Sequence, residues 1–206
     1  MVETPQTSGF TAATSEDKDG AAEDDPGPSF LHLLTEHDGW REIDGAEAAV
    51  RRVYDAAVAM LPDMLAERDV SVVLSSDEAV AALNARYRGK NQPTNVLSFP
   101  AAPSAPGGGP IEGERPPLGD VIIARETLIS EATDEKTPLL FHLSHLTVHG
   151  LLHLAGFDHE TDREAERMEA RERLILASIG IPDPYSPTTD EAPGQSGKWQ
   201  TNGNQQ

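Results

Sequence analysis

The sequence predicts an α+β fold in which short strands and longer helices share one core. Four short apolar runs suited to strands are interleaved with segments whose apolar residues recur at helical spacings of three and four. The helical segment at about 138–155 carries four of the seven histidines, and its length and apolar face indicate a buried, central position. Thr137 and Pro138 offer this helix a capping hydroxyl and a first-turn proline.

The predicted domain spans residues 29–182. Residues 1–28 and 183–206 are acidic or polar and have few apolar side chains. Such segments bury too little surface to offset the entropy of ordering, so we predict disordered tails. Residues 101–117 contain five prolines and four glycines, which predicts a flexible loop inside the domain.

The element boundaries follow from residues that start or stop helices. Asp44 is a candidate N-cap, and Pro62 is expected to kink its helix or end it early. Gly89 ends the next helix, and Thr161 with Glu164 forms a capping box for the last one. In chain order we predict strand 29–35, helix 44–65, strand 69–75, helix 78–87, strand 95–99, strand 118–124, helix 125–133, helix 138–155 and a helix from Thr161 to about Ser178.

The composition disfavours several classes of protein. The formal charge of −19 argues against broad non-specific nucleic-acid binding, although a small basic patch is compatible with it. The chain has no cysteine, which excludes a disulfide scaffold and a thiolate metal site. The acidic start has no apolar signal region, and no run approaches the roughly 20 apolar residues of a membrane span. We therefore expect a cytoplasmic protein with no membrane contact.

Three histidines predict a metal site. His149 and His153 are four residues apart, so on a helix they point the same way. Gly156 is expected to end that helix in the left-handed conformation, and the reversal brings His159 back to face them. Three converging imidazoles leave an open position for water, as in catalytic zinc sites. Zinc is the default ion, although nickel or another divalent ion fits similar ligands.

Gly150 separates this site from a protease. The histidine spacing matches the zinc-protease pattern H-E-x-x-H-x-x-G-x-x-H except at one position, where Gly150 replaces the glutamate. That glutamate is the protease's general base. Its absence removes the proton acceptor for peptide hydrolysis and leaves metal binding intact. A glycine here also allows another element to pack close to the helix.

Arg86, Arg88 and Lys90 place three cations within five residues of an acidic chain. They either complement the dipole at the end of a helix or bind phosphate. His145 lies one helical turn before His149. It either lines the metal site or serves the fold.

Three sequence blocks resemble the YbeY family of metal-dependent endoribonucleases. The run from His145 to His159 contains the family hallmark H-G-x-L-H-L-x-G-[YF]-D-H. Residues 83–100 match a second block, L-N-x-x-Y-R-G-K leading into P-T-N-V-L-S-F-P, and residues 118–120 (L-G-D) match a third. The blocks occur in family order and together span about residues 29–182. Asn91, where the family usually has aspartate, the longer loop at 101–117 and the two tails are departures.

The resemblance implies a fold, a metal and a function. The fold is a mixed sheet flanked by helices, with the metal at the base of a cleft. The metal is one zinc ion held by His149, His153 and His159. The function is cleavage of single-stranded RNA in small-subunit ribosomal RNA maturation and ribosome quality control, with ribosomal or ribosome-associated proteins as partners. The resemblance also implies an important arginine at Arg88.

Arg88 is then the candidate for binding phosphate and stabilising charge in the transition state. Further candidate RNA contacts are Arg86, Lys90, Asn95, Ser98 and His145. Two alternatives stay open from the residues: a zinc hydrolase of another class, and a non-catalytic ribosome assembly factor stabilised by its metal. Structural zinc sites usually have four protein ligands, so a fourth ligand from His145 would favour the second alternative.

Overall fold

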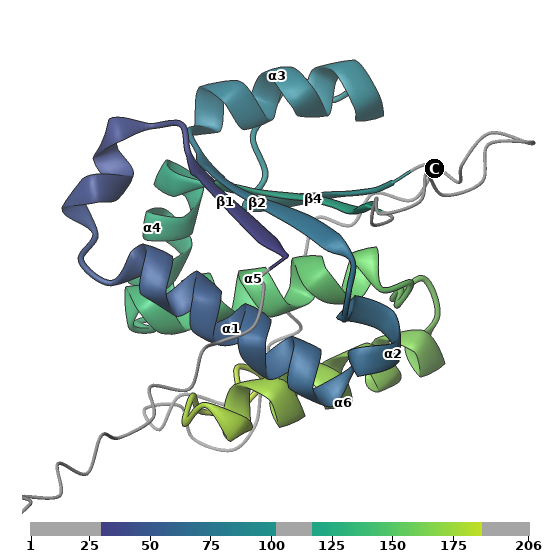
Figure 1. Ribbon diagram of the computed structural model, residues 1–206. Helices are drawn as coiled ribbons and strands as arrows, with labels where there is room; N and C mark the ends of the chain where they lie inside the picture. The colour runs from purple at the N-terminus through teal and green to yellow at the C-terminus, as the bar shows by residue number, and fades with distance from the viewer. Residues whose placement is uncertain (1–29, 102–116, 187–206) are drawn as a thin grey trace, which may run out of the picture.

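The computed structural model describes residues 30–101 and 117–186, which are built around one four-stranded sheet (Figure 1). Its strands are β1 (Leu31–Thr35), β2 (Asp69–Ser75), β3 (Val96–Pro100) and β4 (Pro117–Ala124). The order across the sheet is β1-β2-β4-β3. β1 and β4 each pair with β2 in parallel, whereas β3 pairs with β4 antiparallel and forms an edge. The sheet is therefore mixed, and the predicted α+β fold is confirmed.

Helices cover both faces of the sheet (Figure 1). They are the 3₁₀ helix η1 (Asp38–Glu42), α1 (Ala46–Met60), α2 (Pro62–Leu65), α3 (Asp77–Arg88), α4 (Arg125–Asp134), α5 (Leu139–Leu154) and α6 (Asp162–Ser178). α3 lies on one face, α1 and α5 lie on the other, and α6 packs against α1 and α5 on the side away from the sheet. None of the described helices is long and apolar enough to cross a membrane.

α5 is the central helix. Eleven of its 16 residues are buried. It contacts α1, α4 and α6 as well as β3 and β4. A helix that is apolar nearly all round is stable only when other elements surround it. The central, buried position predicted for the histidine helix is therefore confirmed.

Gly150 sets how closely α5 approaches the sheet. A Cβ atom on Gly150 would lie 2.5 Å from Val121 Cγ1 of β4 and 3.2 Å from Ser98 Oγ of β3. The Ser98 hydroxyl also donates a hydrogen bond to Gly150 O at 3.3 Å. No side chain fits at this position unless the Val121 side chain or β4 moves. The glutamate of the protease pattern therefore has no room here.

The predicted helix 44–65 is two helices. Leu61 leaves the helical conformation, with φ −132° and ψ 51°, and Pro62 begins α2. Proline lacks the main-chain N–H that a continuing helix needs but suits a first turn, so the expected early end is confirmed. The expected Asp44 cap is wrong. Gly45 is the N-cap residue, with φ 80° and no side-chain hydrogen bond.

Two further details differ from the prediction. Pro138 is the N-cap residue of α5, and no side chain caps this helix, so the expected Thr137 cap is wrong. η1 was not predicted, because its residues show no apolar period. Trp40 anchors it, since this ring is buried and its Nε1 donates a hydrogen bond to Ser75 O at 2.8 Å.

The described residues cover the predicted domain unevenly. The predicted tail 1–28 and residues 102–116 of the predicted loop lie outside them. At the other end, the described chain continues to residue 186, beyond the predicted domain end at 182. Tyr185 in this stretch packs edge-on against the His145 ring, with 5.5 Å between centroids.

The C-terminal ends of α3 and α5 lie on the same side of the molecule. The two helices run in the same general direction on opposite faces of the sheet (Figure 1). On this side the end of β3, the start of β4 and the end of α5 meet. A Cβ atom on Gly119 would lie 2.2 Å from Phe99 O and 3.0 Å from Leu154 Cδ2.

Candidate metal centre

α5 presents His149 and His153 one turn apart, and the chain after the helix returns His159 to them. Gly156 ends the helix with φ 86°. The main-chain N–H of Phe157 closes this cap by donating back to a carbonyl of the last turn at 2.9 Å. The expected role of Gly156 as the helix stop is confirmed.

The three imidazoles converge on one point. One ring nitrogen of each of His149, His153 and His159 lies within 4.8 Å of the chosen nitrogens of the other two. His149 Nε2 and His153 Nε2 are 3.0 Å apart. Nitrogens bound to a tetrahedral zinc ion at about 2.0–2.1 Å lie roughly 3.3 Å apart, so this spacing is close to that of one ion. These three residues form the candidate metal centre.

The other ring nitrogens explain why a cation fits there. His149 Nδ1 donates to Glu172 Oε1 at 2.8 Å, and His153 Nδ1 donates to Phe157 O at 3.1 Å. A neutral imidazole has one N–H, so both Nε2 atoms then carry a lone pair. Two lone pairs 3.0 Å apart repel each other unless a cation lies between them. The donor set therefore suits a metal ion.

His153 is held in the neutral form that a metal requires. Burial, reinforced by the nearby His149 and His159, lowers the pKa of His153 from 6.5 to about 4. At neutral pH this imidazole carries no second proton. A protonated histidine cannot bind a metal, so the environment of His153 favours a metal ion over a proton as the shared cation.

Glu172 of α6 supports this centre and was not predicted. Its fully buried carboxylate accepts hydrogen bonds from His149 Nδ1 at 2.8 Å, from His145 Nε2 at 3.3 Å and from the Tyr185 hydroxyl. Burial by itself raises the pKa of Glu172, but the hydrogen bonds from the two histidines outweigh it and hold this pKa well below its usual range. The carboxylate is therefore ionised inside the core.

A signal for Glu172 is present in the sequence. The buried face of α6 includes Met168, Glu172 and Ile175, which follow one another at spacings of four and three. Glu172 thus occupies a position on the apolar stripe of a helix whose other charged residues lie outside this stripe. An acid at such a position is rarely buried without a partner, so it identifies a residue with a specific role.

The first two histidines of α5 lie inside the protein. His145 Nε2 faces Glu172, and its ring centroid is 6.4 Å from that of His149. His142 Nε2 lies 2.9 Å from Glu131 Oε2. Both histidines are less than a tenth exposed. His145 was a candidate RNA contact or fourth ligand, and the structure directs its Nε2 to a carboxylate instead of the metal centre.

Asn95 and Ser98, also candidate RNA contacts, form hydrogen bonds within the fold. Asn95 Nδ2 donates to Glu131 Oε2 at 3.0 Å, and Asn95 Oδ1 accepts from the Val96 main chain at 2.7 Å. The Ser98 hydroxyl donates to Gly150 O. Both side chains therefore have a role in the fold, whereas RNA contact stays a prediction for each.

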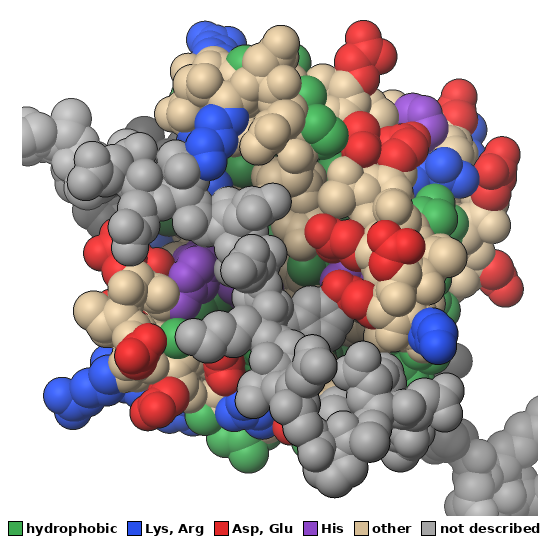
Figure 2. All heavy atoms as spheres, turned by 180° about the vertical axis from the view of Figure 1, so that it is seen from behind, with side chains coloured by type: hydrophobic (Ala, Val, Ile, Leu, Met, Phe, Trp, Pro, Cys, Tyr) green, Lys and Arg blue, Asp and Glu red, His purple; other side chains and the backbone are tan. Residues whose placement is uncertain are grey.

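The predicted cations lie at the end of α3. Arg86 and Arg88 are exposed, and Lys90 is half-buried. Arg86 lies over the Tyr87 ring, 5.4 Å from its centroid. Tyr87 is 59% exposed, and its ring centroid is 5.1 Å from that of Phe99. Figure 2 shows Lys and Arg side chains (blue) above a group of His side chains (purple) on one face. The ends of α3 and α5, which carry the predicted cations and histidines, lie on the same side of the molecule but on opposite faces of the sheet (Figure 1).

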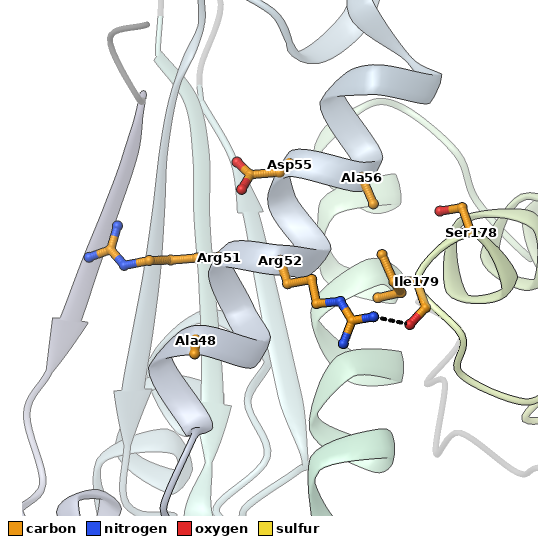
Figure 3. A pocket seen from close by; sticks show the side chains of 7 residues that line it. All are labelled: Ala48, Arg51, Arg52, Asp55, Ala56, Ser178 and Ile179. Carbon is orange, nitrogen blue, oxygen red and sulfur yellow. Dashed lines mark hydrogen bonds between the residues drawn. The ribbon is translucent and has the colours of Figure 1, made fainter. Parts of the chain in front are cut away.

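A pocket between α1 and the end of α6 is separate from the histidines (Figure 3). Arg52 spans it and donates a hydrogen bond to Ile179 O just after α6. This bond satisfies a carbonyl at the end of a helix, where a cation also complements the dipole. Arg52 therefore has a structural role, because it joins α1 to the end of α6.

Comparisons with known proteins agree with the sequence resemblance. The family model described as Endoribonuclease YbeY matches residues 35–180. Endoribonuclease YbeY of Nitrobacter winogradskyi is 49% identical over 157 residues, covering 75% of this chain and 81% of that protein. Endoribonuclease YbeY of Rhodopseudomonas palustris strain BisA53 is 51% identical over 160 residues, covering 77% and 91%. The solution structure of TM1509 from Thermotoga maritima aligns with a TM-score of 0.47 and 21% identity, covering 80% and 99%. The extent of the family match and the identity to these relatives show that the chain belongs to the YbeY endoribonuclease family.

Proposed function

We propose that this protein is a zinc-dependent endoribonuclease that cleaves single-stranded RNA in the maturation of small-subunit ribosomal RNA and in ribosome quality control. Family membership supports hydrolysis of RNA. The observation that carries the proposal is the convergence of His149, His153 and His159, all partly accessible to solvent. An acceptor set of this kind supports a reaction that needs a cation beside the scissile phosphate.

His149, His153 and His159 would hold one zinc ion. A bound divalent ion supplies Lewis acidity at a phosphoryl oxygen and a way to activate water near neutral pH. Neutral imidazoles suit zinc, and the low pKa of His153 keeps this ligand available well below pH 7. His145 is turned toward Glu172, which favours three protein ligands and an open position for substrate.

Arg88 is the proposed catalytic arginine. A guanidinium binds two phosphate oxygens at once and stays charged, so it stabilises the charge that develops on phosphate. Arg86 and Lys90 would contact neighbouring phosphates. Tyr87 is exposed beside them and offers a surface on which an unpaired base can stack. Stacking requires an unpaired base, which agrees with a preference for single strands.

We further propose that the protein works in the cytoplasm together with ribosomal or ribosome-associated proteins. A chain of formal charge −19 repels RNA over most of its surface. The positive group at the end of α3 is small, so a protein partner that delivers RNA to the histidines would compensate for weak RNA affinity.

Two other functions fit less well. A zinc peptidase needs a general base beside its first ligand, and the packing of Val121 against Gly150 leaves no space for one. A metal that only stabilises the fold usually has four protein ligands. The hydrogen bond between His145 and Glu172 removes the nearest candidate for a fourth ligand.

The test is RNA cleavage by metal-stripped protein, with defined metals added back. A single-stranded RNA oligonucleotide, its duplex and the DNA of the same sequence are the substrates. We expect no cleavage by the stripped protein and recovery with zinc on the single-stranded RNA. A His153→Ala protein purified in the same way controls for contaminating nucleases, and His32→Ala, an exposed histidine on β1, controls for loss of any histidine. Equal cleavage with and without metal would contradict the proposal.

A further inference from the structure

Glu172 is a buried charge that needs a reason. Removing a carboxylate from water is strongly unfavourable unless hydrogen bonds replace the solvent. The position lies on the apolar stripe of α6, between Met168 and Ile175, where an apolar residue would fill the core at no such cost. The ionised carboxylate therefore does something for the protein that packing does not.

The two oxygens of Glu172 have different partners. Oε1 accepts from His149 Nδ1 at 2.8 Å. Oε2 accepts from His145 Nε2 at 3.3 Å and from the Tyr185 hydroxyl. Two donors thus fix one oxygen, and the other oxygen is left to orient His149. A proton held on His149 Nδ1 keeps Nε2 free to bind a cation.

Tyr185 reaches Glu172 from the short segment after α6. Arg173 of α6 holds this segment in place: its Nε lies 3.3 Å from Asp183 Oδ1, and its guanidinium carbon is 4.8 Å from the Tyr185 ring centroid. The Tyr185 main-chain N–H also donates to Asp183 Oδ1 at 2.9 Å. The segment is therefore attached to the helix that carries Glu172, with the Tyr185 hydroxyl directed inward.

We propose that Glu172 is the positioning residue of the metal centre and that Tyr185 holds it, so that the segment after α6 sets the metal affinity of His149. The inference rests on the proposed metal site. It predicts that the segment and the metal are coupled in both directions. Docking of the segment on α6 strengthens metal binding, and bound metal strengthens docking of the segment by the same factor. Glu172 itself touches neither the metal nor the RNA.

The first test compares two glutamates that contact histidines of α5. Glu172→Gln keeps the volume and removes the charge, and Glu131→Gln makes the same change beside His142. Zinc affinity is measured by competition with a chromogenic chelator. We expect about a tenfold to hundredfold loss for Glu172→Gln and no change for Glu131→Gln. Cobalt absorption should report an altered ligand geometry only in Glu172→Gln.

The second test removes a single hydroxyl. Tyr185→Phe retains the ring against His145 and Arg173, and we expect its zinc affinity to fall by about threefold to tenfold. The reverse coupling is measured by limited chymotrypsin digestion. Zinc should slow cleavage after Tyr185 in the wild-type protein and protect this bond less in Glu172→Gln.

The stability of the metal-free proteins separates positioning from a purely structural role. Positioning predicts a lower zinc affinity and an altered cobalt spectrum for Glu172→Gln at temperatures where the metal-free protein is still folded, even though the weakened hydrogen bonds also lower its melting temperature. A lower melting temperature with unchanged zinc affinity and an unchanged cobalt spectrum would overturn the inference while leaving the metal site intact. A wild-type protein that binds neither zinc nor cobalt would overturn both this inference and the proposed function.

Discussion

The two halves of α5 use the same residue type in different ways. In the N-terminal half, His142 and His145 are buried, and each has an Nε2 directed at a glutamate. In the C-terminal half, His149 and His153 are more accessible and direct their Nε2 atoms toward each other. All four fall on one stripe of one helix, so periodicity does not distinguish them.

The difference lies in what surrounds the second half. In the N-terminal half, the imidazoles pair with acidic side chains of α4 and α6. In the C-terminal half, the chain after α5 folds back and places a third imidazole, that of His159, beside the other two. Among these four histidines, only His149 belongs to both environments. Its Nδ1 donates a hydrogen bond to Glu172, and its Nε2 faces the candidate metal centre. A histidine of α5 can act as a metal ligand when its partners leave a lone pair directed at a shared point.

Replacing one histidine from each half should separate the two uses most strongly. His153→Ala should reduce bound zinc from one ion to well below one per chain and abolish RNA cleavage. His142→Ala should keep the zinc but reduce the free energy of unfolding by about 1–3 kcal/mol, since it removes a buried ring and one of the hydrogen-bond partners of Glu131. Zinc content by atomic absorption and chemical denaturation check the two results. Equal zinc loss in both variants would erase the distinction.

Reversing the charge of Arg88 tests whether the end of α3 acts together with the histidines in the C-terminal half of α5. Arg88→Glu should reduce RNA cleavage by about a hundredfold while zinc content and melting temperature stay constant. Arg51→Glu, on α1 beside the separate pocket, makes the same change in net charge and should cleave RNA normally. Similar losses in both variants would mean that only the overall charge matters.

Adding one methyl group at Gly150 tests how closely the C-terminal half of α5 packs on the sheet. Gly150→Ala should reduce the free energy of unfolding by about 1–3 kcal/mol, because its Cβ would lie 2.5 Å from Val121 Cγ1. Val121→Ala in the same protein should recover part of this loss, although each change alone is destabilising. Strictly additive losses, measured by urea denaturation, would show that the two residues do not press on each other.

Glu135, whose Oε2 lies 3.7 Å from His142 Nδ1, gives the smallest expected effect. Burial, opposed by His142 and reinforced by Glu131, raises the pKa of Glu135 from 4.5 to about 7. Between pH 4.5 and about 7 the folded state therefore holds a proton on Glu135 that the unfolded state has lost. The free energy of unfolding falls as the pH rises across this range. Glu135→Gln should raise the free energy of unfolding by about 1 kcal/mol at pH 8 and leave it unchanged at pH 4. Denaturation at both pH values checks this, and an equal gain at pH 4 would contradict it.

The sequence by itself determined the four strands, the longer helices and the three converging histidines. Proline and glycine act through their own backbone chemistry, so the split at Pro62 and the stop at Gly156 could be predicted from the local sequence. The spacing of His149, His153 and His159 is likewise local, since one helical turn and one reversal bring them together.

Only the tertiary structure decided which histidines are turned inward. Glu172 and Tyr185 lie 23 and 36 residues from His149, and their contacts with the histidines depend on how α6 and the segment after it pack on α5. The same packing turns His145 away from the metal centre. Sequence spacing specifies where a side chain points on its own helix, but the partners that take its ring nitrogens come from other parts of the chain.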